Sequence, residues 1–248
     1  MADTPCKFLE WDTDFFGVRV ARVVGDSLTV AGSSAVVDWV HDNAIDCLYF
    51  LCDTDDAESI LAAESMHCHL VDVRVELTLE LDPSRRDTVP MDDLRPATPE
   101  DVPEIMRIAS VSHRDTRFYY DSHFPRETCD RLYARWIERS CEGYADQVFV
   151  MHLDGKPVGY MSCHLLPDGG ASLGLLGVAE SARGRGFGTT LVGAAFDYLR
   201  EQGHCRLTIA TQARNTGALR LYQKYGFQIE KTRLWYHRWS NMKQHSNG

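Results

Sequence analysis

The chain has 248 residues, of which 44% are hydrophobic and 25% charged, and its formal net charge is −10 at pH 7. These values are typical of a globular protein, and the acidic balance argues against a nucleic-acid partner, which requires a basic surface. No apolar run approaches the roughly 18 residues of a membrane span, and no signal peptide precedes Trp11. We therefore expect no membrane partner. The eight cysteines are scattered and form no Cys-x-x-Cys pair, which together with the charge favours a cytoplasmic protein.

Residues 1–82 are predicted to form a small α/β subdomain. Adjacent aromatic residues at Phe15 and Phe16 precede Gly17, and one strand face cannot bury both of them. We therefore expect Phe16 to reach a ligand, with a plug between domains as the open alternative. Farther along, β-prone and helix-periodic segments alternate. The expected strands lie near 18–24, 47–51 and 68–81, and the expected helices near 33–43 and 56–65.

A metal site is not expected in this subdomain. His67, Cys68 and His69 are adjacent, and in a strand neighbouring side chains point to opposite faces. No second cluster of ligands follows them, as a structural zinc site would require. We interpret the three as ordinary strand residues.

Residues 83–92 are predicted to be a polar linker, residues 93–240 a second domain, and residues 241–248 a polar tail. In the second domain, Thr98 is expected to cap a helix that runs through Ile108, with Pro99 at its first position. Asp154-Gly155 is a hairpin-turn signal between two strands. The remaining elements, in chain order, are a strand at 94–98, a helix at about 126–141, strands at 147–152, 156–166 and 171–178, a helix after Gly188, a strand at 206–211, a helix after Asn215 and a strand through Tyr236.

A glycine-rich turn joins the strand at 171–178 to the following helix. Its sequence is Arg183-Gly184-Arg185-Gly186-Phe187-Gly188. Glycines let the backbone approach a phosphate closely, and the free N–H groups of a first helical turn point toward it. The two arginines add positive charge beside the helix dipole. Since the glycine spacing matches neither a dinucleotide fingerprint nor a P-loop, we predict a site for another kind of pyrophosphate.

A second motif follows the strand at 206–211. It is Asn215-Thr-Gly-Ala-Leu219-Arg-Leu221-Tyr222-Gln-Lys-Tyr225-Gly226-Phe227, in which Asn215 is a good N-cap and Gly226 a helix-ending glycine. The residues alone leave open whether Asn215 is more than a cap and whether Tyr222 is more than a packed aromatic. Tyr225 competes with Tyr222 for a chemical role, but lies one turn on and faces differently.

Arg183-x-x-Gly186-x-Gly188 and the Asn215–Phe227 block, in this order, resemble the two motifs of the GNAT superfamily of acetyltransferases. The resemblance implies an α/β fold in which a central mixed, mostly antiparallel sheet is flanked by helices. It implies acetyl-CoA as co-substrate and a V-shaped opening beside a strand that admits the pantetheine arm. By the same match Asn215 contacts CoA, and Tyr222 protonates the departing thiolate. The cofactor-binding residues so implied are Leu176, Gly177, Val178, Arg183, Gly184, Arg185, Gly186, Phe187, Gly188, Asn215 and Tyr222.

The segment Ser112–Tyr120 supplies local basicity for an anionic acceptor. It combines two arginines and a histidine with three aromatic residues in a loop between helices. Arginine pairs with phosphate and an aromatic ring stacks on a base, so this mixture can hold a nucleotide diphosphate. The substrate-binding residues predicted here are Arg114, Arg117, Tyr119 and Tyr120.

Short matches along the chain resemble the sugar-nucleotide acetyltransferases within this superfamily. They are Trp11-x-x-x-Phe15-Phe16-Gly17-Val18, Leu70-Val71-Asp72, Arg117-Phe118, Tyr133-Ala-x-Trp136-Ile137-Glu138 and Ala210-Thr211-Gln212-x-x-Asn215-Thr216. This resemblance implies transfer to the 4-amino group of a TDP-linked amino-dideoxy sugar, with Asp72 drawing the amine proton, directly or through water. The segment Tyr119-Tyr120-Asp121 departs from these relatives, which leaves the identity of the sugar open.

Two other functions remain open on the sequence. A protein or peptide N-acetyltransferase would share the catalytic half, but would be indifferent to Arg117 and to free TDP. A non-catalytic CoA-binding module would bind without turnover, and the intact Asn215–Tyr222 block weighs against it. The sequence allows a homodimer and does not specify the acyl chain length.

Overall fold

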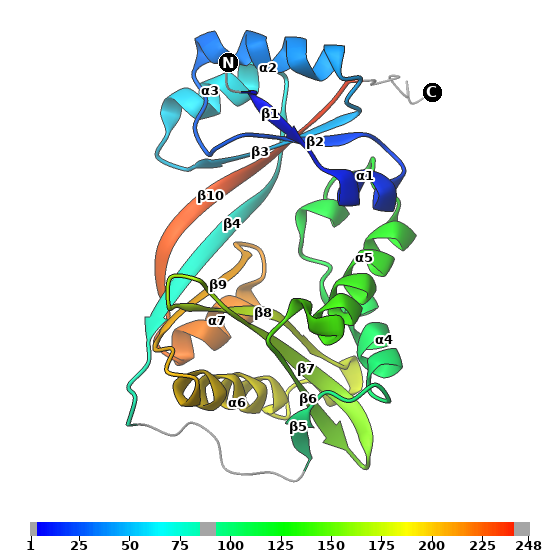
Figure 1. Ribbon diagram of the computed structural model, residues 1–248, viewed down its shortest axis with the longest axis vertical. Helices are drawn as coiled ribbons and strands as arrows, with labels where there is room; N and C mark the ends of the chain where they lie inside the picture. Colours follow the sequence, from blue (N-terminus) through cyan, green and yellow to red (C-terminus); the bar gives the residue numbers. More distant parts are fainter. Residues whose placement is uncertain (1–3, 85–92, 241–248) are drawn as a thin grey trace. The chain divides into compact units, whose positions relative to one another are not determined.

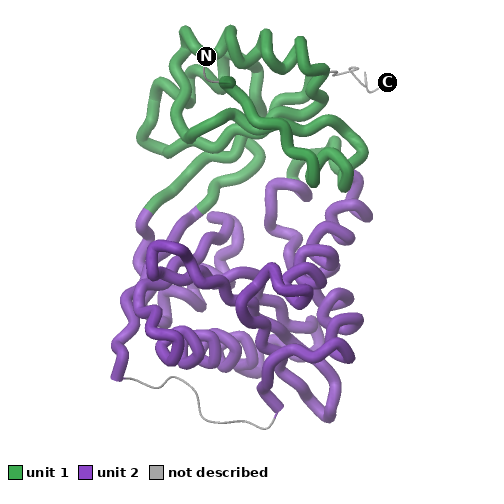
Figure 2. Tube along the Cα trace, in the orientation of Figure 1, with its two compact units in different colours: residues 1–74, 120–124, 231–248 green, residues 75–119, 125–230 purple. Residues whose placement is uncertain are grey.

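A computed structural model of the protein describes residues 4–84 and 93–240 (Figure 1). The chain forms two compact units (Figure 2), of which unit 1 takes the described parts of Met1–Arg74, Tyr120–Phe124 and Lys231–Gly248, and unit 2 those of Val75–Tyr119 and Pro125–Glu230. Both units are discontinuous in sequence, whereas the predicted division at residues 82 and 93 is contiguous; that division stays a prediction. Most of the predicted linker and the whole predicted tail lie outside the described residues. Within residues 4–84 and 93–240, no helix is long and apolar enough to cross a bilayer.

Unit 1 is a sheet with a hydrophobic core on one face. Its elements are β1 (Cys6–Phe8), α1 (Glu10–Phe16), β2 (Val20–Val23), α2 (Val30–Asp42), β3 (Cys47–Asp53) and α3 (Ala57–Ser65), with parts of β4 (His69–Glu80) and β10 (Gln228–Trp239). The strands follow the order β1-β2-β3-β10-β4; β2 and β3 are parallel, and β10 is antiparallel to β3. Apolar residues of α2 and α3, among them Val36, Val40 and Ala63, form the core with Leu48 and Phe50 of β3.

The aromatic segment before Gly17 is helix α1 and not a strand. Helical spacing places Trp11 and Phe15 on one face, with stacked rings whose centroids lie 5.1 Å apart. Gly17 ends the helix at a φ of 70°, in the left-handed region that glycine adopts without strain. The strand argument applied to Phe16 is therefore wrong, and its role as a ligand contact stays a prediction.

Unit 2 is a mixed, mostly antiparallel sheet flanked by helices, as the family resemblance predicts. Its elements, besides the second part of β4, are β5 (Leu94–Pro96), α4 (Val102–Ser112), η1 (Arg117–Tyr119), α5 (Arg126–Arg139), η2 (Ser140–Tyr144), β6 (Gln147–Leu153), β7 (Lys156–Leu165), β8 (Ala171–Val178), η3 (Glu180–Ala182), α6 (Phe187–Glu201), β9 (Arg206–Gln212) and α7 (Thr216–Lys224). The strand order is β4-β9-β8-β7-β6-β5. The pairs from β5 to β8 are antiparallel, and β8 and β9 are parallel.

Helices α4 and α6 cover opposite faces of this sheet. Met161 and Cys163 of β7 belong to the buried cluster that contains Leu191 of α6. Tyr160, which points to the other side of the pleat, is hydrogen-bonded to His113 at the end of α4. The sheet of unit 2 is therefore buried on both faces, with α4 on one and α6 on the other.

Most elements of unit 2 follow the sequence pattern, but α4 begins later than predicted. Asp154 and Gly155 form the predicted hairpin turn, with φ values of 51° and 73°. Helix α4 begins at Val102, since the carboxylate of Asp101 accepts a hydrogen bond from the Thr98 backbone N–H at 2.9 Å. That bond holds residues 98–101 in a turn ahead of the helix.

The buried Asp101 carboxylate is a stability determinant of unit 2. It accepts hydrogen bonds from Arg95 Nη1 at 2.7 Å and His152 Nε2 at 2.8 Å, besides Thr98. Although burial raises it, these hydrogen bonds hold the pKa of Asp101 well below its ordinary value. We expect Asp101→Asn to lower the free energy of unfolding by about 2–4 kcal/mol at pH 7, because Arg95 then loses its counter-charge.

The same carboxylate gives this effect a pH dependence. Because the folded-state pKa of Asp101 is lowered, its contribution is fully present above the unfolded value of about 3.9 and is lost progressively as the pH falls from that value through the lower folded-state pKa. Urea unfolding should therefore show a difference from the wild type that is largest at pH 7 and is reduced, but still present, at pH 3. The exposed turn variant Asp154→Asn is the control, expected to change stability by less than about 0.5 kcal/mol. Equal stability of Asp101→Asn and wild type at pH 7 would contradict the assignment.

Candidate active site

Two parallel strands of unit 2 separate part-way along their length. The register of β8 with β9 runs from Ala171–Leu207 to Leu173–Ile209. Both strands continue, β8 to Val178 and β9 to Gln212. The part of β8 from residue 174 to 178 therefore keeps its pairing with β7, while its edge toward β9 is open. The predicted cofactor residues 176–178 lie on this part of β8, where the family resemblance implies a V-shaped opening; their contact with CoA stays a prediction.

The open part of β8 carries a β-bulge. Met161 pairs with Leu176 and Cys163 with Leu173, so Gly174 and Leu175 together oppose the single residue Ser162. The Leu175 backbone N–H donates to the Ser162 hydroxyl oxygen at 2.8 Å. The bulge changes the twist of the strand where its pairing with β9 ends.

The glycine-rich loop after β8 leads directly into helix α6. Gly184 and Gly186 have φ values of 75° and 87°, and added Cβ atoms there would meet nothing within 4 Å. Gly186 is the N-cap of α6 and supplies no side-chain hydrogen bond, so the first-turn N–H groups, including those of Phe187 and Gly188, are not capped by it. Arg185 lies over the Phe187 ring at 5.1 Å, and Arg183 Nε donates to the Val178 carbonyl at 3.2 Å. The loop thus has an open, donor-rich concave side of the type that binds phosphate.

Three elements converge beside this loop. A Cβ on Gly188 would lie 3.8 Å from the Leu221 side chain of α7 and 3.9 Å from Val178 at the end of β8. The second motif therefore lies against the first. Asn215 caps α7, since its side-chain oxygen accepts the Ala218 N–H at 3.1 Å. The capping role that the sequence predicts is confirmed, and the contact of Asn215 with CoA stays a prediction.

Tyr222 and Tyr225 have different environments. Tyr222 is 4% exposed and packs in the core with Phe227, at a ring-centroid distance of 5.7 Å. Burial raises the pKa of the Tyr222 phenol above its ordinary value. The Tyr225 hydroxyl instead donates to the Thr189 carbonyl in the first turn of α6. Tyr225 thus ties α7 to α6, and the role of Tyr222 as proton donor stays a prediction.

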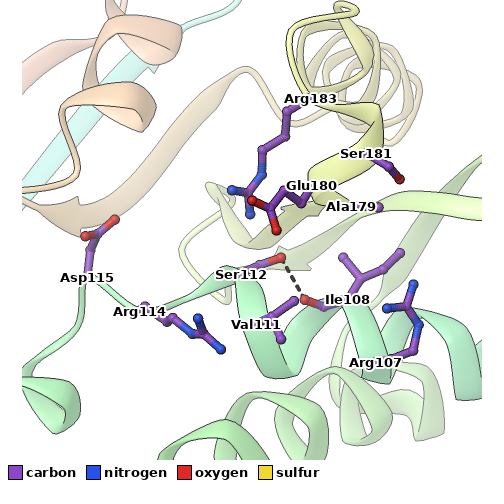
Figure 3. Close-up of a pocket in the computed structure, with 10 residues that line it drawn as sticks. All are labelled: Arg107, Ile108, Val111, Ser112, Arg114, Asp115, Ala179, Glu180, Ser181 and Arg183. Atoms are coloured by element: carbon purple, nitrogen blue, oxygen red, sulfur yellow. Dashed lines mark hydrogen bonds between the residues drawn. The ribbon is translucent and has the colours of Figure 1, made fainter.

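A pocket of about 780 Å³ lies in unit 2 between the end of α4 and the segment after β8 (Figure 3). Arg183 and Glu180 extend from the β8 side toward the end of α4, where the Ser112 hydroxyl donates to the Ile108 carbonyl at 2.7 Å. Arg107 on the α4 wall is ion-paired with Glu104. The lining residues are Arg107, Ile108, Val111, Ser112, Arg114, Asp115, Ala179, Glu180, Ser181 and Arg183.

This pocket contains residues that the sequence interpretation missed. Arg107 and Val111 are spaced by one helical turn on α4, and Glu180 and Ser181 directly follow the predicted cofactor strand. The helical spacing of the first pair and the place of the second pair next to that strand could have identified them as candidates. The sequence could not show that the two pairs face the same pocket, because that depends on how α4 packs against β8.

The predicted acceptor residues of unit 2 are only partly brought together. Arg114 lines the pocket with Arg183. Arg117 lies over the Phe118 ring at 4.3 Å. The Tyr119 hydroxyl donates to Asp130 at 2.6 Å, and burial together with Asp130 raises the pKa of that phenol. Arg117 and Tyr119 do not line the pocket, and their contact with substrate stays a prediction.

The remaining predicted residues belong to unit 1. Asp72 is on β4 and 3% exposed, Tyr120 is 56% exposed, and Phe16 packs against Phe124 with centroids 4.6 Å apart. Residues 120–124 join unit 1 through the carboxylate of Asp121, a contact that the sequence did not indicate. That carboxylate accepts hydrogen bonds from His237 Nδ1 at 2.7 Å, Trp239 Nε1 at 2.9 Å and His123 Nδ1 at 2.8 Å.

Comparison with known proteins places this site in a family. Residues 105–227 match the model of the acetyltransferase (GNAT) family. The dTDP-fucosamine acetyltransferase of Escherichia coli is 27% identical over 233 residues, which are 93% of this chain and 96% of that protein. The spore coat polysaccharide biosynthesis protein SpsD of Bacillus subtilis is 29% identical over 164 residues, 66% of this chain but only 56% of that relative.

Solved structures agree on the fold. A GCN5-related N-acetyltransferase from Sphaerobacter thermophilus superposes with a TM-score of 0.65 at 16% sequence identity, covering 94% of this chain and 76% of that one. The family match includes most of α4, β8, the glycine-rich loop and α7, which are the elements around the open part of β8 and the pocket. Residues 105–227 are therefore an acetyltransferase domain of the GNAT family.

Proposed function

We propose that the protein transfers the acetyl group of acetyl-CoA to the 4-amino group of a TDP-linked amino-dideoxy sugar. The observation that carries the proposal is the similarity to dTDP-fucosamine acetyltransferase, which extends over 93% of this chain and so beyond the family domain. The GNAT family contains enzymes with many acceptors, so a shared acceptor would be expected to depend on residues outside the family domain at 105–227. The alignment with this relative includes most of those residues.

The proposed donor site is the opening between β8 and β9 with the loop that follows it. The loop fits a pyrophosphate, because Gly184 and Gly186 leave its concave side free of side chains and α6 begins there. The side-chain nitrogen of Asn215 is proposed to donate a hydrogen bond to CoA, because the side-chain oxygen already accepts one from the Ala218 backbone N–H. Backbone N–H groups at 176–178 on the open part of β8 would polarise the thioester carbonyl.

The proposed chemistry is direct transfer. The acceptor amine must lose a proton before its nitrogen forms the new bond to the acetyl carbon, and Asp72 is proposed to take that proton, directly or through water. As the carbon–sulfur bond breaks, Tyr222 donates its proton to the thiolate, and its raised pKa keeps the phenol protonated beforehand. Cys163 is not proposed as an acyl carrier, since it is fully buried and burial raises the pKa of its thiol to about 12.

The pocket beside the donor loop is the proposed acceptor site of unit 2. Arg107, Arg114 and Arg183 are the cations on its walls. A nucleotide diphosphate carries two negatively charged phosphates, and arginine is the side chain best suited to pair with them. The partner is therefore proposed to be a small anionic molecule. A homodimer stays a prediction, as does the cytoplasmic location, with which the eight free cysteines agree.

Thiol release from acetyl-CoA tests the proposal. The acceptor panel would contain TDP-4-amino-4,6-dideoxygalactose, peptides, polyamines and aminoglycosides, with free TDP as a competitor. We expect turnover on the sugar nucleotide, competition by TDP and a raised KM in Arg114→Ala. If the protein acetylates peptides and TDP does not inhibit that activity, the acceptor is a protein or peptide and the proposed sugar substrate is wrong. Binding of acetyl-CoA without turnover on any acceptor would favour a non-catalytic module.

A further inference from the structure

Gly177, on the open part of β8, has an aromatic ring directly over it. Gly177 and Tyr160 are Cα partners in the β7–β8 ladder, and a Cβ on Gly177 would lie 2.6 Å from ring atoms and from the hydroxyl of Tyr160. Such a distance is far inside van der Waals contact, so only glycine fits beneath this ring. The position of the Tyr160 ring therefore sets the position of the β8 backbone at residue 177.

The ring of Tyr160 is itself held from α4. Its hydroxyl shares a hydrogen bond with His113 Nε2 at 2.7 Å, and Tyr160 is fully buried. His113 lies at the C-cap of α4 and stacks on Tyr133 of α5, with centroids 4.8 Å apart. The Tyr133 hydroxyl donates to Thr116 Oγ1 at 2.7 Å. Tyr160 and His113 thus connect the open part of β8 to the C-terminal end of α4 and to the middle of α5.

This connection joins the two walls of the pocket. Ser112 and Arg114, which flank His113, line one wall (Figure 3). The other wall begins at Ala179, two residues after Gly177. Burial lowers the pKa of His113 to about 4 and raises that of Tyr160, so the pair is neutral near pH 7 and the connection does not depend on an ion pair.

We propose that His113 and Tyr160 are positioning residues, which hold the open part of β8 at the distance from β9 that acetyl-CoA needs to enter between the two strands. The pair touches neither proposed reacting group. It fixes the backbone of residues 176–178, whose N–H groups the proposed function directs at the thioester, and so this inference rests on the proposed acetyl-CoA site. The inference predicts that residues 174–178 of β8 become more mobile when the hydrogen bond between His113 and Tyr160 is removed. This effect can be measured without any ligand.

The variants are His113→Leu and Tyr160→Phe, each of which removes one partner of the hydrogen bond. His113→Gln is the conservative variant, because its side-chain amide can place a nitrogen near the position of Nε2. Tyr144→Phe, at a tyrosine that is 68% exposed, is the matched control for loss of a hydroxyl. Tyr160→Phe keeps the ring over Gly177, so it separates the hydrogen bond from the packing.

Hydrogen exchange of the ligand-free protein is the first measurement. We expect amide exchange in the peptide covering 174–178 to accelerate about tenfold or more in His113→Leu and Tyr160→Phe, with β6 unchanged. His113→Gln should stay close to wild type. Equal loss of protection in β6 would indicate general destabilisation and overturn the inference, as would unchanged exchange in both peptides.

Calorimetric titration with acetyl-CoA at a temperature well below unfolding is the second measurement. We expect Kd to rise about tenfold in the two disrupting variants, to recover in His113→Gln and to stay unchanged in Tyr144→Phe. A wild-type protein that does not bind acetyl-CoA would contradict the proposed function, while the exchange result would still decide whether the pair holds β8. Faster exchange at 174–178 with unchanged acetyl-CoA affinity would refute the positioning role.

Discussion

Tyr222→Phe is expected to lower kcat by about two to four orders of magnitude and to leave the Kd of acetyl-CoA within about twofold. The substitution removes only the hydroxyl, which is the proton donor in the proposed chemistry. The ring remains to pack against Phe227, so the free energy of unfolding should change by less than about 1 kcal/mol. Because burial raises the pKa of Tyr222, its ionisation should not limit the wild-type rate at neutral or mildly alkaline pH. Steady-state kinetics and titration with acetyl-CoA measure the two effects separately.

Tyr225→Phe is the matched control for this prediction. It removes a hydroxyl of the same residue type from the same helix end, where that hydroxyl donates to the Thr189 carbonyl. We expect any loss to appear mainly in acetyl-CoA affinity, since Thr189 is in the first turn of α6, and kcat at saturation to stay within about threefold. A large loss of kcat in Tyr225→Phe with a nearly unaffected Tyr222→Phe would reverse the assignment of the proton donor.

Local signals are the reason that the strand, the glycine-rich turn and the helices of the proposed donor site could be predicted. Residues 171–188 contain a strand, two glycines at fixed spacing and the start of a helix. The geometry of each depends mainly on residues nearby in the chain, so the sequence pattern is enough to predict it. Gly186 requires a positive φ, and Asn215 caps the helix that it precedes. For the same reason the hairpin at Asp154 and Gly155 was predicted correctly.

Long-range contacts account for what the sequence could not predict. The pocket is lined by Arg107 of α4 and Arg183 of the glycine-rich loop, which are distant in sequence and come together only through the packed sheet. Residues 120–124 join unit 1 because Asp121 bonds to His237 on the last strand. Helix α1 was missed for a different reason, since its seven residues are too few for a clear periodicity.

Gly186→Asp is expected to weaken acetyl-CoA binding by about 100-fold, which corresponds to roughly 2.7 kcal/mol. Gly186 has a φ of 87°, and a side chain added there meets nothing within 4 Å, so the new carboxylate has room on the open side of the loop. Among side chains, Asp and Asn tolerate this left-handed backbone best, which keeps the strain small. The carboxylate would repel the pyrophosphate that the loop is proposed to hold.

Gly186→Asn separates that repulsion from the steric effect, because Asn has nearly the same shape and the same backbone tolerance but no charge. We expect Gly186→Asn to weaken acetyl-CoA binding about tenfold, because its side chain keeps the phosphates from approaching the loop backbone as closely. The remaining difference between Asp and Asn should shrink when ionic strength rises from about 0.05 to 0.5 M, since salt screens exposed charges. Gly155→Asn, at a φ of 73° in the β6–β7 hairpin, controls for the backbone change and should bind acetyl-CoA normally. Equal affinities for the Asp and Asn variants at low salt would show that no anion binds at this loop, and the donor site would then have to lie elsewhere in unit 2.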